Sequence, residues 1–286
     1  MKNILEVNSI FKRYNDFHLE DISFRLPKGY IMGLVGPNGA GKTTIIKSIV
    51  NAINIDRGNI KVFGLDFKTD EIKIKESLGY ISDEIYFLDT WTAKDINTIM
   101  NKIYSSWDSR TFTKYANRNN LPMDKPIQGY SSGMKTKLML ATVFSRDTKL
   151  LILDEPTSGL DPVMRDEFLT LIKEYIRDGE RSVLYSTHIT TDLEKTADFI
   201  TFVNDGRLVF SEEIDTLKEN YYLIKDSLDV LDNIKSLCIG IRKNEYGFEA
   251  LTTRDNLNKI PNSCVRQPAN IEEIVVFSSR KGEMLR

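Results

Sequence analysis

The chain has 286 residues, of which 41% are hydrophobic and 28% charged, and this composition indicates a globular protein with one large domain and a small appendage. Its formal net charge of -2 provides no broad positive field, so nucleic acid is not expected as a partner. The apolar runs fall short of the ~18 residues that span a bilayer, and the N-terminus lacks a signal-peptide pattern, so a cytoplasmic location is expected. The two cysteines, Cys238 and Cys264, are expected to be plain thiols.

The first predicted elements are β-strands that lead to a glycine-rich loop. Apolar patterns predict strands at Ile4–Ile10 and Leu19–Leu26, followed by a buried strand at Ile31–Val35. The sequence GPNGAGKTT follows directly and opens a helix predicted over Lys42–Ala52. Because a helix start directs unpaired N–H groups toward an anion, a glycine turn between a buried strand and a helix predicts a phosphate-binding loop. An ordinary glycine turn is the alternative, which the flanking elements disfavour.

The residue types of this loop suit a nucleotide with magnesium. Glycine at positions 36, 39 and 41 lets the backbone approach phosphate closely. Lys42 adds a positive charge, and Thr43 offers a hydroxyl to Mg²⁺, an ion that prefers oxygen ligands. The residues predicted to bind the nucleotide here are Gly36, Pro37, Asn38, Gly39, Ala40, Gly41, Lys42, Thr43 and Thr44.

The middle of the chain is predicted to leave the sheet and return to it. Gly58–Gly64 is expected to be an edge strand and Glu76–Ser82 another strand, whereas Thr92–Tyr104 and Asp108–Arg118 have helical patterns. These helices, with the helix that follows them, are expected to form an insert over about residues 84–145.

Strands and helices alternate after the insert, which implies an α/β fold with a mainly parallel sheet and helices on both faces. The predicted elements are strand Leu150–Leu153, helix Pro162–Arg177, strand Ser182–Ser186, helix Thr190–Lys195 and strand Phe199–Asn204. From about Tyr221 the segments become shorter and more weakly patterned. We therefore expect one domain over residues 1–220 and a small α+β accessory domain over 221–286.

Three polar residues follow predicted strands and should lie at the ligand-binding edge of the sheet. Asp154 suits a magnesium shell, and Glu155 is expected to point the other way, where it can orient and deprotonate an attacking water. An acidic pair that only complements the dipole of the next helix is the alternative. His188 follows Ser182–Ser186, although a single histidine is commonly structural. His18 has no partner motif and is expected to be structural or solvent-facing.

The ordered set of motifs resembles the ATPase subunit of ABC transporters, over roughly Asn3 to Lys218. The matching parts are Walker A at Gly36–Thr44, Walker B at Leu150–Asp154 with Glu155 following, the D-loop at Ser158–Asp161 and the switch histidine at His188. The resemblance implies a P-loop NTPase core with an antiparallel β subdomain. It also implies ATP hydrolysis with Mg²⁺, with Lys42, Glu155 and His188 as catalytic residues.

The resemblance assigns further contacts to the nucleotide. Tyr14 matches the aromatic residue that stacks on adenine, with an ordinary tyrosine at a strand end as the alternative, and Asp161 belongs to the D-loop. Ser131 and Gly133 match the signature motif, which binds the γ-phosphate of a nucleotide held by another subunit. Ser131 is also a natural N-cap for a helix that continues through Phe144, and such a helix start attracts anions.

Two motifs depart from the pattern of the family. The usual LSGGQ is replaced by YSSGM at Tyr130–Met134, which keeps the serine and the second glycine. The glutamine of the Q-loop is replaced by Asp83, which adds negative charge near a triphosphate. We expect Asp83 to keep the metal contact and to make ATP affinity more dependent on magnesium.

The resemblance also implies partners, namely an integral-membrane permease and a second ATPase subunit that is identical or homologous. The chain would then be peripheral on the inner face of the membrane. The segment IYFLDTW at Ile85–Trp91, with Trp107, is expected to dock the permease, to form a small core of the insert, or both.

The drug, lantibiotic or lipid exporter branch is the most similar, through YSSGM, through STHIT followed by Asp192 and Leu193, and through the segment at Pro268–Glu272. A non-transport ABC ATPase and a regulatory ATP-binding module are the alternatives. The transported substrate would be contacted by the permease.

Overall fold

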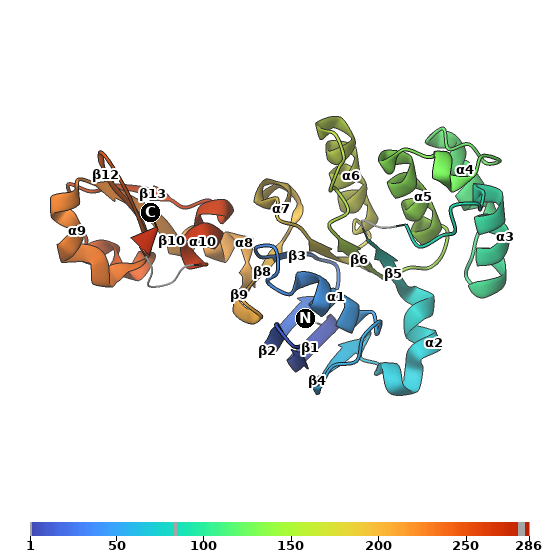
Figure 1. Ribbon diagram of the computed structural model, residues 1–286, viewed down its shortest axis with the longest axis horizontal. Coiled ribbons are helices and arrows are strands. Elements are labelled where there is room, and N and C mark those ends of the chain that lie inside the picture. Colours follow the sequence, from blue (N-terminus) through green and yellow to red (C-terminus); the bar gives the residue numbers. More distant parts are fainter. Residues whose placement is uncertain (1, 83–84, 280–283, 286) are drawn as a thin grey trace.

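The computed structural model describes residues 2–82, 85–279 and 284–285, and in these residues the strands form two sheets (Figure 1). The first has nine strands in the order β4-β1-β2-β9-β8-β3-β7-β6-β5. In chain order these strands are β1 (Asn3–Arg13), β2 (His18–Pro27), β3 (Ile31–Val35), β4 (Arg57–Val62), β5 (Leu78–Ile81), β6 (Leu150–Asp154), β7 (Ser182–Ser186), β8 (Phe199–Asn204) and β9 (Arg207–Glu213).

The first sheet combines a parallel part with an antiparallel part. Strands β8, β3, β7, β6 and β5 are parallel neighbours, whereas β1 pairs antiparallel with both β2 and β4. Strand β9 joins the two parts, because it pairs antiparallel with β8 and parallel with β2. This confirms the expected α/β core and its antiparallel subdomain.

Helices cover both faces of the parallel part, as predicted. They are α1 (Lys42–Ile49), α2 (Phe67–Ser77), α5 (Ser132–Phe144), α6 (Pro162–Tyr175), α7 (Thr190–Thr196) and α8 (Ile214–Asn220). Side chains alternate between the two faces of each strand, so Ile31 and Val35 of β3 pack with α5, α6, α7 and α8, whereas Met32 and Leu34 pack with α1 and α2. Figure 1 shows these helix groups on opposite sides of the sheet.

Some boundaries and elements differ from the prediction. Helix α1 ends at Ile49, earlier than expected, because Asn51 adopts the left-handed region with φ 58°. Helix α2 was not predicted, since it is polar on most sides and buries only Phe67 and Ile74. Strand β9 and helix α8 were also missed.

The helical insert has a core of its own. It contains α3 (Ala93–Ile103), α4 (Ser109–Arg118) and the short 3₁₀ helix η1 (Ile127–Gly129), packed against α5. Phe87 and Trp107 are buried in this core, and Trp107 Nε1 donates to Asn97 Oδ1 at 2.8 Å. Tyr86 and Leu88 are instead 52% and 60% exposed. The aromatic segment is therefore only partly used for packing within the insert.

The second sheet lies at the opposite end of the molecule from the insert (Figure 1) and has the order β13-β10-β12-β11-β14. Its residues up to 279 form one core of their own around Phe248 and Ile224, under helix α9. Leu223 and Leu251 instead join α10 and the apolar cluster of the first sheet. The elements are β10 (Tyr221–Asp226), α9 (Leu228–Ile234), η2 (Lys235–Leu237), β11 (Cys238–Asn244), β12 (Gly247–Thr253), η3 (Arg254–Lys259), β13 (Val265–Pro268), α10 (Ile271–Ser278) and β14 (Met284–Leu285).

Both cysteines lie in this second region as free thiols, as expected. Burial raises the pKa of Cys238 and of Cys264 to about 11, so both stay protonated at neutral pH. Across the part of the chain that the structure describes, we find no helix with the length and apolar character needed to cross a bilayer.

Candidate functional site

The glycine-rich loop connects β3 to α1 and is shaped by two glycines. A Cβ on Gly36 would lie 2.3 Å from the carbonyl oxygen of Val203, so a larger residue does not fit there. Gly41 has φ 104° and is the N-cap of α1, where it offers no side chain to the first amides of the helix. The helix therefore begins with N–H groups that no capping side chain occupies, as an anion-binding loop requires.

Lys42 places a buried positive charge inside this loop. The side chain is part of a residue that is only 6% exposed, and Nζ donates to the carbonyl oxygens of Gly36 at 2.8 Å and Pro37 at 3.3 Å. Nζ also lies 3.7 Å from Glu155 Oε1. A buried ammonium is stable only when anionic or polar groups surround it, so the loop is built around a fixed cation.

Asp154 and Glu155 both form hydrogen bonds with Ser186, the last residue of β7. Asp154 is 5% exposed, and its Oδ1 accepts a 2.6 Å hydrogen bond from Ser186 Oγ. The backbone N–H of Glu155 is 3.2 Å from both Oγ and the carbonyl oxygen of Ser186. Glu155 adopts φ 49°, a conformation that is uncommon for a residue with a Cβ and that costs about 1–3 kcal/mol unless its surroundings impose it.

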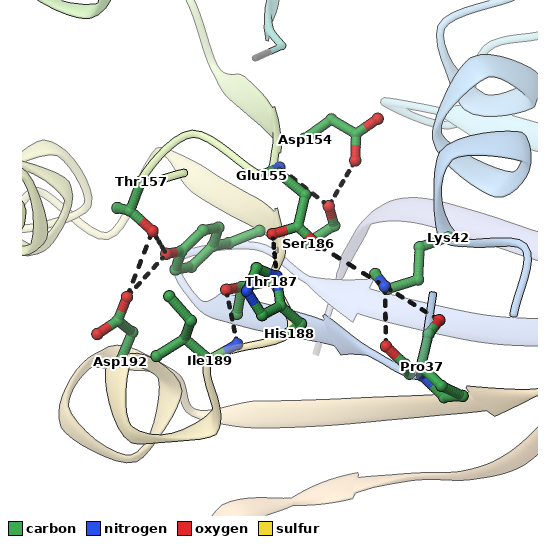
Figure 2. A network of polar contacts seen from close by, with 12 residues as sticks. Pro37, Lys42, Asp154, Glu155, Thr157, Ser186, Thr187, His188, Ile189 and Asp192 are labelled. Carbon is green, nitrogen blue, oxygen red and sulfur yellow. Dashed lines mark hydrogen bonds and ion pairs between the residues drawn. The ribbon is translucent and has the colours of Figure 1, made fainter. Parts of the chain in front are cut away.

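Glu155 connects Lys42 to His188, as Figure 2 shows. Glu155 Oε2 lies 2.9 Å from Nδ1 of His188, and Oε1 faces Lys42. The histidine donates in this contact when Nδ1 carries its proton. Residues from the segments that follow β3, β6 and β7 are thus brought together at one edge of the sheet. This set is called the Lys42–Glu155–His188 chain below.

Tyr14, the residue expected to stack on adenine, lies at the turn between β1 and β2. Tyr14 is 45% exposed, with Lys12 Nζ 5.6 Å from its ring centroid. Phe17 was not predicted, yet its ring contacts the glycine loop, because a Cβ on Gly41 would lie 2.8 Å from Phe17 Cζ. The only signal in the sequence that could have predicted this contact is an apolar residue, Phe17, in an otherwise polar turn. His18 is exposed, as expected.

The signature and D-loop residues do not join the Lys42–Glu155–His188 chain. Ser131 caps α5 by accepting from the N–H of Met134 at 3.3 Å, and Asp161 caps α6 in the same way. A Cβ on Gly133 would meet Met164 Cε at 2.0 Å, so α5 and α6 are in close contact there. Helices α5 and α1 pack on opposite faces of the first sheet.

The oxygen donors expected for a metal are Thr43 at the start of α1 and Asp154 at the end of β6. The third, Asp83, lies outside the described residues. Within the described ranges, no three His, Cys, Asp or Glu side chains cluster as a metal site. One hydroxyl and one buried carboxylate fit Mg²⁺ only if phosphate and water supply its other ligands, which is the usual way that this ion binds.

Comparison with known proteins relates this chain to ATP-binding proteins of ABC transporters. The family profile described as ABC transporter matches residues 19–158. The ABC transporter ATP-binding protein YtrB of Bacillus subtilis (strain 168) is 33% identical over 216 residues, which cover 76% of this chain and 74% of that protein. The lantibiotic transport ATP-binding protein SrtF of Streptococcus pyogenes is 31% identical over 215 residues, or 74% of this chain and 92% of that protein.

The similarity extends further in some relatives and in three dimensions. The bacitracin transport ATP-binding protein BcrA of Enterococcus faecalis is 27% identical over 263 residues, which cover 91% of this chain and 84% of that protein. A solved structure of the ATP binding subunit of an ABC transporter has a TM-score of 0.69 and 26% identity, over 75% of this chain and 92% of that one. The chain therefore belongs to the ABC transporter family, as an ATP-binding protein that hydrolyses ATP.

Proposed function

We propose that this chain powers the export of a drug, peptide or lipid-like substrate through a separate membrane permease. The Lys42–Glu155–His188 chain is the observation that supports ATP hydrolysis as the energy source, since it joins a fixed cation, a carboxylate and an imidazole at the end of three parallel strands. Relatives named for lantibiotic and bacitracin transport support the exporter branch.

In this proposal each residue of the site has one task. Lys42 and the amides of Gly36–Thr44 bind the β- and γ-phosphates, and Glu155 orients and deprotonates the attacking water. His188 contacts the γ-phosphate in the transition state, where charge stabilisation supplies much of the rate. Magnesium, held by Thr43, Asp154 and Asp83, would neutralise charge on the phosphates.

A second ATPase subunit completes the nucleotide site. Tyr14 stacks on adenine in the same chain, whereas the exposed Ser131 and the neighbouring Gly133, at the start of α5, bind the γ-phosphate of a nucleotide held by the partner. Asp161 contributes from the D-loop at this junction. The packing of α5 and α1 on opposite faces of one sheet supports this division, because it separates the two anion-binding helix starts within a chain.

The permease contact is assigned to the helical insert. Leu88 and part of the Tyr86 ring are exposed beside a well-packed core, although the Tyr86 hydroxyl donates to Tyr80, so both side chains can bury further apolar surface against another protein. The chain is then cytoplasmic and peripheral on the inner face of the membrane. Residues 1–220 form the ATP-binding domain, and residues 221–286 form an accessory domain.

The variant Glu155→Gln tests this proposal. Without the carboxylate, hydrolysis of ATP by the full chain should fall by about 10²- to 10⁴-fold, while ATP still binds. A closed dimer should then accumulate with ATP, which size-exclusion chromatography and a phosphate-release assay measure together. A variant that stays monomeric with ATP and hydrolyses at the normal rate contradicts the proposal.

A further inference from the structure

A second polar cluster lies near the Lys42–Glu155–His188 chain, and the proposed function assigns no role to it. It consists of Thr157, Tyr185 and Asp192, which are all buried, and of Arg165 from α6 (Thr157 and Asp192 are labelled in Figure 2). Asp192 is only 4% exposed. A buried carboxylate is costly unless other groups compensate its charge, so its surroundings need an explanation.

Two hydroxyl groups face one oxygen of this carboxylate. Oδ2 of Asp192 lies 3.3 Å from the hydroxyl of Tyr185 and 3.4 Å from Oγ1 of Thr157, and the two hydroxyls are 2.9 Å apart. They have two hydrogens between them, so one hydrogen joins the hydroxyls and the other is donated to Asp192. Burial raises the pKa of Tyr185 above its usual range, so this hydroxyl remains a donor at neutral pH.

Arg165 supplies the opposite charge. Its Nε lies 3.9 Å from Asp192 Oδ2, and this nitrogen is buried with no hydrogen-bond partner among the residues that the structure describes. Apolar side chains of similar volume would fill such a site at equal or lower free-energy cost, because desolvating an ion pair offsets most of its attraction. The polar cluster therefore specifies geometry more than it adds stability.

The cluster contacts the two segments that contain Glu155 and His188. Thr157 stands two positions after Glu155, and Tyr185 stands three positions before His188. Asp192 thus contacts both the segment that leaves β6 and the strand that leads to the histidine. Glu155 has an uncommon backbone conformation, with φ 49°, that persists only when its surroundings hold it, and Thr157 of this cluster follows it two positions later in the chain.

We propose that Asp192 is a positioning residue for ATP hydrolysis, which fixes the carboxylate of Glu155 relative to His188 by holding Thr157 and Tyr185 together. The proposal rests on the proposed function, because it assigns to Asp192 an effect that passes through Glu155. Arg165 balances the charge of Asp192 and links the same cluster to α6, the helix that begins after Asp161.

Kinetics of the full chain with Asp192→Ala test the proposal. A small displacement of a catalytic group lowers the chemical rate strongly, so kcat should fall by about 10- to 100-fold, while KM for ATP changes by less than about threefold. Asp192→Asn keeps the shape and one acceptor oxygen and should recover part of kcat. Asp215→Asn is the matched control, an exposed aspartate in the first turn of the short helix α8, and should leave kcat unchanged.

A double variant separates positioning from general damage. In the Glu155→Gln background, Asp192→Ala should lower the residual rate by less than about twofold, because the group that it positions is already absent. An equal loss in both backgrounds, or a loss confined to KM, overturns the proposal. If Glu155→Gln hydrolyses ATP like the wild type, the proposed function fails instead.

Two further variants decide the matter if Asp192→Ala does not fold. Tyr185→Phe and Thr157→Val keep the shape of each side chain and remove one hydroxyl. Both should lower kcat with little change in KM, and a normal kcat in both overturns the proposal.

Discussion

The two sheets of this protein differ in the side chains that they bury. The buried charged side chains of the described residues, Lys42, Asp154 and Asp192, all belong to the nine-stranded sheet and its helices. From Tyr221 to residue 279 the buried polar side chains are the hydroxyls of Thr252 and Ser278. Burying charge costs free energy that packing alone does not repay, so the difference separates a region shaped for chemistry from one shaped for stability.

The largest expected effect comes from removing the buried cation. Lys42→Ala should reduce ATP binding and hydrolysis by more than about 100-fold, because the amides of the loop alone do not compensate the charge of a triphosphate. Fluorescent-nucleotide titration and phosphate release measure the two effects. Lys47→Ala, at an exposed position in the last turn of the same helix, is the control and should bind ATP normally. Equal loss in both variants would show that the position of the charge is unimportant.

Two buried serines at opposite ends of β7 sharpen the comparison within a single strand. Ser186→Ala removes the hydroxyl that contacts both Asp154 and the N–H of Glu155, so kcat should fall by about tenfold. Ser182→Ala removes a hydroxyl that accepts from the N–H of Gly29 and should lower the melting temperature, with kcat retained. An equal loss of kcat in both variants would contradict the expectation that only the carboxyl end of β7 affects catalysis.

The difference between the regions also explains what the sequence could predict. The strand at Ile31–Val35 and the following glycine loop can be predicted from local patterns, because the residues that determine them are adjacent in the chain. The same holds for the predicted strand before Asp154. These elements and the family were confirmed, together with the helices on both faces of the sheet.

Contacts between distant segments could not be predicted in this way. Ser186 of β7 contacts Asp154 of the neighbouring strand β6, and Asp192 of α7 contacts Thr157 in the turn after β6. Phe17, in the turn between β1 and β2, contacts the glycine loop that follows β3. Composition and spacing contain no information on such pairs, since their approach depends on the order of strands in the sheet.

In the C-terminal region a helix cap should affect stability and leave catalysis unchanged. Asn270 accepts from the N–H of Glu273 at 2.8 Å in a capping box at the start of α10, so Asn270→Ala should cost about 1 kcal/mol of unfolding free energy. Ser227→Ala, at the N-cap position of α9 where no side-chain cap is made, is the matched control and should cost less. Thermal unfolding measures both. A clear loss of kcat in Asn270→Ala would connect the second sheet to the chemistry of the first.

The smallest effect concerns Asp83, which replaces the neutral amide expected from the family. Asp83→Gln removes the negative charge that we propose to lie near the triphosphate, so ATP should bind more tightly without magnesium, by about threefold. Loss of an anionic ligand should weaken the response to added magnesium, so the affinities with and without the ion should approach each other. ATP titrations at a series of magnesium concentrations measure this difference. Identical curves for the wild type and the variant would remove the metal contact of Asp83 from the proposed site, and the magnesium ligands from the chain would then be Thr43 and Asp154 alone.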